Sequence, residues 1–150
     1  MSERKSVKVG SITAGKQPSA AELAALQREG FRSVVNVRQV RESSQGLSPS
    51  QERRLALDLG LAFVHLPVSA ENLSEKDVRA FQDAIAELPV PVYVHCGLGQ
   101  RAATLALLAN ADGDASATTR IAQAEDKGIA ISPRVREFVD RCVESRKAKR

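Results

Sequence analysis

The hydrophobic positions of this chain form short apolar runs separated by longer stretches in which they recur at helical spacing. The runs are rich in Val, Ile and Leu, which predicts buried strands. We expect strands at Val7–Ile12, Ser33–Val37, Ala62–Val68 and Val92–His95. We expect helices over residues 19–28, 49–59, 75–88, 101–111, 117–127 and 133–147.

Serine residues mark the starts of several predicted helices. Ser19 is followed three residues later by Glu, Ser48 by Gln and Ser74 by Asp. In a capping box, such a pair satisfies two free N–H groups at the start of a helix. Ser132 precedes a proline, which is favoured at the first helical position. These local signals fix the boundaries between helix and strand well.

Strands that alternate with helices predict an α/β fold, with a mainly parallel central sheet of about four strands and helices on both faces. The 150 residues suit a single domain, with a basic C-terminal tail over residues 145–150 that we expect to be flexible. Ligands of open α/β sheets bind beyond the carboxyl ends of the strands. Cys96 follows the last predicted strand, so it lies where a ligand site is expected.

The sequence VYVHCGLGQR at residues 92–101 carries the main chemical signal. A buried strand delivers Cys96 into a glycine-rich turn, and Arg101 follows close to the start of a helix. Backbone N–H groups of such a turn, together with the helix N-terminus, bind anions and favour a reactive thiolate. Arg101 could hold two oxygens of an anion at once. We expect the anion-binding loop to comprise Gly97, Leu98, Gly99 and Gln100, with φ > 0 accessible at both glycines.

The same residues also have a plainer interpretation. A cysteine after a buried strand is often a small apolar core residue, and glycines there often only form a turn. The coincidence of strand, cysteine, glycine turn and arginine favours the anion-binding interpretation over this one.

Composition narrows the possible functions. The chain has 43% hydrophobic and 27% charged residues, as in ordinary globular proteins. We expect neither a secretory signal nor a membrane span, and a cytoplasmic location in which both cysteines stay reduced. The net charge is +4, but eight of the 22 Lys and Arg lie outside residues 9–140. With no Trp and one Tyr available for stacking, nucleic acid is not an expected partner.

Three segments in order resemble the cysteine-based phosphatase superfamily, in its dual-specificity branch. They are Val34–Arg38 with Glu42 after it, the strand Phe63–Val68, and the loop His95–Arg101. More closely, the chain is similar to the bacterial phosphatase-like domain of beta-lactamase-hydrolase-like proteins, a family also described as sulfurtransferase-like. The resemblance covers about residues 7–140. It implies a protein tyrosine phosphatase-like fold, with Cys96 as nucleophile and Arg101 as the anion-binding arginine.

Two positions differ from the superfamily pattern. Protein tyrosine phosphatases have five residues between the cysteine and the arginine, whereas this chain has four, as rhodanese-type sulfurtransferases also do. Related loops carry Ser or Thr after the arginine, where a hydroxyl assists the thiolate as leaving group. Here that position is Ala102, and Thr104 lies almost a turn further on, which predicts slow turnover.

The remaining roles follow from the loops around the cysteine. The resemblance places a general acid in the loop after strand Ala62–Val68, where Glu71 is the only carboxylate. An exposed loop residue without a role is an equally good interpretation of Glu71. We expect His95 to support the loop from the opposite face of the strand, and Arg38 either to pair with Glu42 beneath the site or to contact the substrate at its periphery. The spacing of the His and Cys residues predicts no metal, and no cofactor is expected.

Three functions remain open. The first is a cysteine-dependent phosphatase that hydrolyses phosphotyrosine, in a phosphorylated protein, or a small aryl-phosphate ester through a cysteinyl-phosphate intermediate. The second is a rhodanese-like sulfurtransferase that carries a persulfide on Cys96 and takes sulfur from thiosulfate or a sulfide-derived donor. The third is a catalytically silent anion-binding domain.

Overall fold

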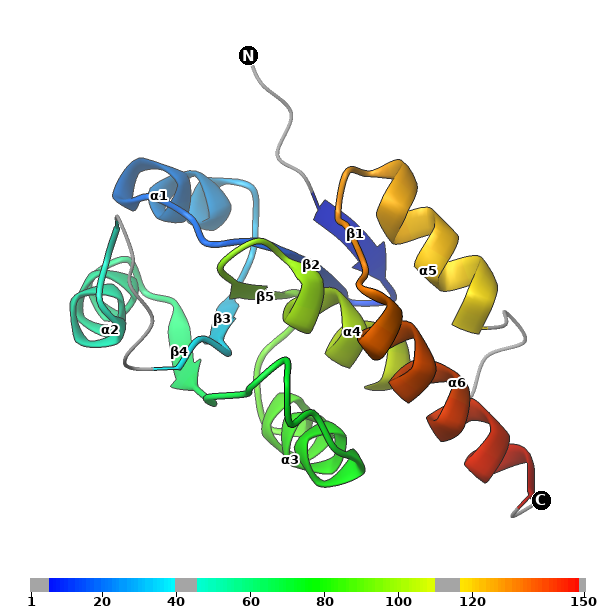
Figure 1. Ribbon diagram of the computed structural model, residues 1–150. Helices are drawn as coiled ribbons and strands as arrows, with labels where there is room; N and C mark the ends of the chain where they lie inside the picture. The colour runs from blue at the N-terminus through cyan, green and yellow to red at the C-terminus, as the bar shows by residue number, and fades with distance from the viewer. Residues whose placement is uncertain (1–5, 40–45, 110–116, 149–150) are drawn as a thin grey trace.

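A single five-stranded sheet organises the part of the chain that the computed structural model describes, residues 6–39, 46–109 and 117–148. The strands are β1 (Ser6–Val9), β2 (Ile12–Lys16), β3 (Ser33–Asn36), β4 (Ala62–His65) and β5 (Val92–Cys96). The helices are α1 (Ala20–Arg28), α2 (Pro49–Asp58), α3 (Glu75–Ala86), α4 (Gln100–Ala109), α5 (Ala117–Asp126) and α6 (Pro133–Ala148). The strand order is β1-β2-β5-β3-β4, which places β5 at the centre (Figure 1).

The predicted α/β fold with a mainly parallel sheet and helices on both faces is confirmed, with one more strand than expected. The segment Val7–Ile12 is not a single strand, because the chain turns at Gly10 and Ser11. Gly10 has φ 62°, a backbone conformation that glycine adopts without steric cost. The turn produces the hairpin of β1 and β2, the only antiparallel pair among the described strands.

The serine signals at the helix starts are confirmed. The Ser19 Oγ atom accepts a hydrogen bond from the Glu22 N–H group (3.1 Å), and the Glu22 carboxylate accepts one from the Ser19 N–H group (3.0 Å). Ser48 and Gln51 form the same reciprocal pair at the start of α2. These bonds satisfy N–H groups that have no partner inside the helix.

The two faces of the sheet have separate apolar cores. Val34 and Tyr93 pack with α1 and α2, in a cluster that includes Leu23, Leu26, Ala56 and Leu61. On the other face Val35, Val94 and Cys96 belong to a larger cluster with α3, α4, α5 and α6. Because side chains alternate along a strand, neighbours in β5 belong to different cores. Figure 1 shows α1 and α2 on one side of the sheet and α4 to α6 on the other.

The two C-terminal helices complete the larger core rather than forming a separate module. Both α5 and α6 contact α4, and their buried apolar side chains join the same cluster. They include Ile121, Ala124, Val135, Phe138, Val139 and Cys142. Helix α6 continues to Ala148, so the basic segment whose flexibility we predicted begins inside this helix.

Candidate active site

Cys96 is the last residue of the central strand, and its side chain turns toward α4. The residue is 1% exposed and lies in the larger apolar cluster. It forms no disulfide with Cys142. The Gly99 N–H group donates a hydrogen bond to the Cys96 Sγ atom over 3.2 Å. The loop thus directs a backbone donor at the sulfur atom.

The loop after Cys96 requires glycine at one of its two glycine positions. Gly99 has φ 103°, and a Cβ atom there would lie 3.4 Å from Ile129 and 3.5 Å from the Gly15 carbonyl carbon. Gly97 is not in the left-handed region, which differs from our expectation for it. A Cβ atom on Gly97 would meet the Arg101 side chain at 3.9 Å, an ordinary contact.

Arg101 lies in the first turn of α4, beside the loop. Its Nη1 atom donates to the Val68 carbonyl oxygen over 3.0 Å, while Nη2 is the atom nearest to the position of a Cβ on Gly97. The guanidinium group is therefore held between the loop and the segment that follows β4. The sequence predicted this meeting of Cys96 and Arg101, and the structure brings them to one cleft.

The cleft has a volume of about 1350 Å³ and opens at the carboxyl ends of the parallel strands. The residues that line it include Lys16, Arg38, Glu71, Cys96, Gly97, Leu98, Gln100 and Arg101. Leu98 lies at its rim and is 77% exposed. Among the described lining residues the only carboxylates are Glu22, which caps α1, and the exposed Glu71. Glu71 thus lies where a general acid was predicted, and its role stays a prediction.

The Thr104 hydroxyl does not replace the one that Ala102 lacks. Ala102 is fully buried, and the Thr104 hydroxyl donates to the Gln100 carbonyl oxygen over 2.8 Å. Gln100 also has a second role that the sequence did not reveal. Its Oε1 atom accepts a hydrogen bond from the Ser132 N–H group (2.5 Å), which ties the loop to the start of α6.

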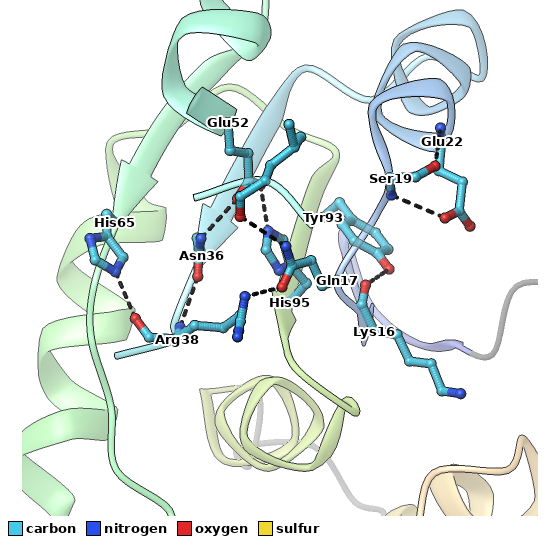
Figure 2. Close-up of polar contacts among 11 residues, drawn as sticks. Lys16, Gln17, Ser19, Glu22, Asn36, Arg38, Glu52, His65, Tyr93 and His95 are labelled. Carbon is cyan, nitrogen blue, oxygen red and sulfur yellow. Dashed lines mark hydrogen bonds and ion pairs between the residues drawn. The ribbon is translucent and has the colours of Figure 1, made fainter. Parts of the chain in front are cut away.

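His95 lies on the opposite face of β5 from Cys96 and is absent from the described lining of the cleft. Its Nε2 atom lies 2.5 Å from the Oε2 atom of Glu52, a residue of α2 (Figure 2). Arg38 lines the cleft and donates to the Gln17 side chain. The expected partner of Arg38, Glu42, lies outside the described residues.

Sequence reasoning missed three polar residues around the loop: Gln17, Asn36 and Glu52. The Gln17 N–H group donates to the Gly97 carbonyl oxygen over 3.4 Å, so this residue contacts the loop through its backbone. Asn36 was visible as part of a strand motif, but its partner was not. Glu52 carried no signal, because a charged residue in the first turn of a helix usually faces solvent.

Helices long and apolar enough to cross a membrane are absent from the described part of the chain. In those same segments, no three side chains of His, Cys, Asp or Glu gather as a metal site requires. The expectation of a metal-free site stays a prediction.

Comparisons with known proteins identify the family of the chain and its fold. The family model for the phosphatase-like domain of beta-lactamase hydrolase-like proteins matches residues 7–113. A beta-lactamase hydrolase-like protein of Agrobacterium fabrum is 37% identical over 100 residues, which are 67% of this chain and 23% of that protein. A protein of the same name from Xylella fastidiosa is 37% identical over 89 residues, or 59% of this chain and 21% of that one. The chain therefore matches less than a quarter of the length of these relatives.

Solved structures share the fold. A candidate phosphatase of Neisseria meningitidis superposes with a TM-score of 0.80 at 22% identity, over 93% of this chain and 99% of that one. The phosphotyrosine complex of TpbA from P. aeruginosa superposes with a TM-score of 0.64 at 18% identity, over 90% of this chain and 85% of that one. At these identities the likeness establishes the protein tyrosine phosphatase-like fold.

Proposed function

Because the chain belongs to the family of phosphatase-like domains of beta-lactamase hydrolase-like proteins, we propose that it is a cysteine-dependent phosphatase that hydrolyses phosphotyrosine or small aryl-phosphate esters. One observation carries the proposal. The Cys96 sulfur accepts a backbone hydrogen bond within a loop that leads into a helix N-terminus, and Arg101 lies against the same loop. This is the arrangement expected of a nucleophile inside an anion-binding site.

The proposed reaction has two steps. The Cys96 thiolate attacks phosphorus, the S–P bond forms, and the ester P–O bond breaks while Glu71 gives its proton to the leaving oxygen. Water then attacks the cysteinyl-phosphate and gives a proton to the Glu71 carboxylate, the S–P bond breaks, and inorganic phosphate leaves with the thiolate and the Glu71 acid restored. Arg101 and the loop amides hold the equatorial oxygens, where the charge of the transition state is spread.

The substrate class is the finer part of the proposal. TpbA, which shares the fold, is described in complex with phosphotyrosine, and this supports an aryl phosphate. The exposed Leu98 at the rim offers an apolar contact to an aromatic leaving group. The phosphate would be carried by a protein or a small ester, and the reduced cytoplasm would keep Cys96 a thiol.

A second candidate is sulfur transfer. The Cys96 thiolate would attack the outer sulfur of thiosulfate, forming a persulfide and releasing sulfite. That reaction needs a thiolate and an anion site but no strong acid. The exposure of Glu71 and the bonding of the Thr104 hydroxyl away from the sulfur favour it.

The deciding experiment is hydrolysis of para-nitrophenyl phosphate by the wild-type protein and Cys96→Ser, side by side under reducing conditions. We expect activity in the wild type and none in the variant, with thermal unfolding nearly unchanged because serine is close in size. Activity of similar size in both proteins would remove Cys96 from the mechanism. Inactivity of both, together with a persulfide on Cys96 after thiosulfate treatment, would identify the sulfurtransferase instead.

A further inference from the structure

A buried acid lies directly behind the cysteine loop and takes no part in the reaction described above. Glu52 belongs to the first turn of α2 and is 0% exposed. Its Oε1 atom accepts a hydrogen bond from the Asn36 Nδ2 atom (2.8 Å), and its Oε2 atom faces the His95 Nε2 atom at 2.5 Å. Figure 2 shows the Glu52 carboxylate between these two side chains, which come from neighbouring strands.

The hydrogen bonds define which group donates. The Asn36 Oδ1 atom accepts the Arg38 N–H group (2.8 Å), so the amide of Asn36 must turn its NH₂ group toward Glu52. The Nδ1 atom of His95 is buried and has no partner among the described residues. A proton on Nδ1 would therefore be buried without an acceptor, which is costly. His95 therefore carries a proton on Nε2 and donates it to Glu52, so both donors converge on one carboxylate.

A carboxylate is not the side chain that would make this buried position most stable. A buried carboxylate loses its hydration, and well-packed apolar side chains of similar size are often as stable or more so. The N-terminus of α2 and two charge-assisted hydrogen bonds offset that cost. The contribution of the carboxylate is to fix the orientation of the Asn36 and His95 side chains, because both donate to it.

Each donor lies one or two residues before a residue that lines the cleft. His95 immediately precedes Cys96, and its carbonyl oxygen accepts the Val37 N–H group (2.9 Å). Asn36 bends the chain after β3 through its bond to the Arg38 N–H group, and Arg38 lines the cleft. A shift of Glu52 would move the ends of β5 and β3 together.

We propose that Glu52 is a positioning residue of the cysteine loop, which fixes the anion-binding geometry of Cys96 and Arg101 through His95 and Asn36. It touches neither substrate nor nucleophile. The inference rests on the proposed function only in taking phosphate as the anion that the loop binds.

The test is Glu52→Gln, which keeps the shape of the side chain but offers one acceptor to two donors. Neither partner can adjust, since Asn36 is held by Arg38 and His95 has no acceptor for a proton on Nδ1. The readout is the rate at which iodoacetamide alkylates Cys96, followed on its own peptide by mass spectrometry, at increasing inorganic phosphate. We expect the phosphate concentration that half-protects Cys96 to rise about tenfold or more, as small misplacements in such sites do.

The matched control is Ala56→Gly in the same helix. Ala56 is fully buried in the apolar cluster, and its side chain has no polar atom that could join the hydrogen bonds of Glu52. This variant should lose thermal stability yet keep wild-type protection by phosphate. Equal weakening in both variants, or wild-type protection in Glu52→Gln, would overturn the inference.

A second pair of variants covers the case in which Glu52→Gln does not fold. His95→Gln keeps an N–H donor for Glu52, whereas His95→Leu removes it. The first should retain protection by phosphate and the second should lose it, and equal behaviour would count against the inference. A wild-type protein that phosphate does not protect would overturn it as well. Protection without hydrolysis of para-nitrophenyl phosphate would refute the proposed phosphatase and leave the role of Glu52 standing.

Discussion

On the face of the sheet that α3 to α6 cover, Cys96 lies within a large cluster of apolar side chains, whereas the face under α1 and α2 combines a smaller apolar cluster with buried polar residues. The polar residues gather at the carboxyl ends of β3 and β5, where Asn36 and His95 meet Glu52. The two faces are thus unequal in chemistry as well as in size.

The difference shows how one strand, β5, contributes to an apolar core on one face and to a hydrogen-bond network on the other. Alternation along β5 directs Cys96 to one face and His95 to the other. The side that holds Cys96 offers tight apolar packing, and the opposite side offers hydrogen bonds that fix the orientation of polar side chains. An apolar cluster lies beneath the loop, while the polar network orients the backbone from which the loop begins. Variants on the two sides should therefore fail in different ways.

The largest effect in this comparison is expected from Arg101→Lys, on the α4 side. A lysine supplies charge but not the planar fork that holds two oxygens and also reaches the Val68 carbonyl. We expect kcat/KM for para-nitrophenyl phosphate to fall by about 10²- to 10³-fold, the usual loss for one oxyanion donor.

The matched control is Arg136→Lys, the same change at an exposed ion pair with Glu125. It should leave kcat/KM unchanged, since exposed pairs contribute little. If Arg101→Lys behaved like this control, Arg101 would have no part in binding the anion.

A smaller effect is expected from Glu71→Gln, at an exposed position in the loop beyond β4. Loss of a general acid should lower the rate on a phosphate ester with a poor leaving group by about 10²-fold and flatten the alkaline limb of the pH–rate profile. Glu75→Gln makes the same change of charge on α3, outside the described lining of the cleft, and should keep the wild-type profile. An alkaline limb that survives in Glu71→Gln would exclude Glu71 as the acid.

The smallest effect is expected from Tyr93→Phe, on the face under α1 and α2. The Tyr93 hydroxyl donates to the Lys16 carbonyl oxygen over 2.7 Å, and its ring packs edge-on against Phe31. Removing the hydroxyl should lower the free energy of unfolding by about 1 kcal/mol in denaturant titrations, with kcat intact. A large fall in kcat would show that this face also controls the loop through the end of β2.

Local sequence signals predicted much of the fold. Ser19 and Ser48 mark helix starts because a capping box involves residues only three positions apart. The hairpin of β1 and β2 was missed because Val7 and Ile12 are apolar at both ends of the turn. Only Gly10 and Ser11 signalled the break, and a glycine inside an apolar run is also compatible with a continuous strand.

The residues of the site likewise fall into those that local sequence predicted and those that it did not. Cys96 and Arg101 are close in sequence, so the motif alone predicted that they meet. The partner of His95 is Glu52, 43 positions away, and nothing local shows that this carboxylate is buried. A buried charge becomes understandable only once its donors are known, and these come from two other elements of the fold.

The hydrogen bond between Gln100 and Ser132 affects which C-terminal boundary a truncated fragment of this chain can have. The family match ends at residue 113, yet one wall of the cleft is formed by Gly128, Ala130, Ile131 and Ser132. A fragment trimmed to the family match would lose this wall, the Ile129 side chain that packs on Gly99, and the cover of the larger core. It would expose apolar surface that invites aggregation. For expression or transplantation into another protein, the smallest useful unit therefore extends through α6.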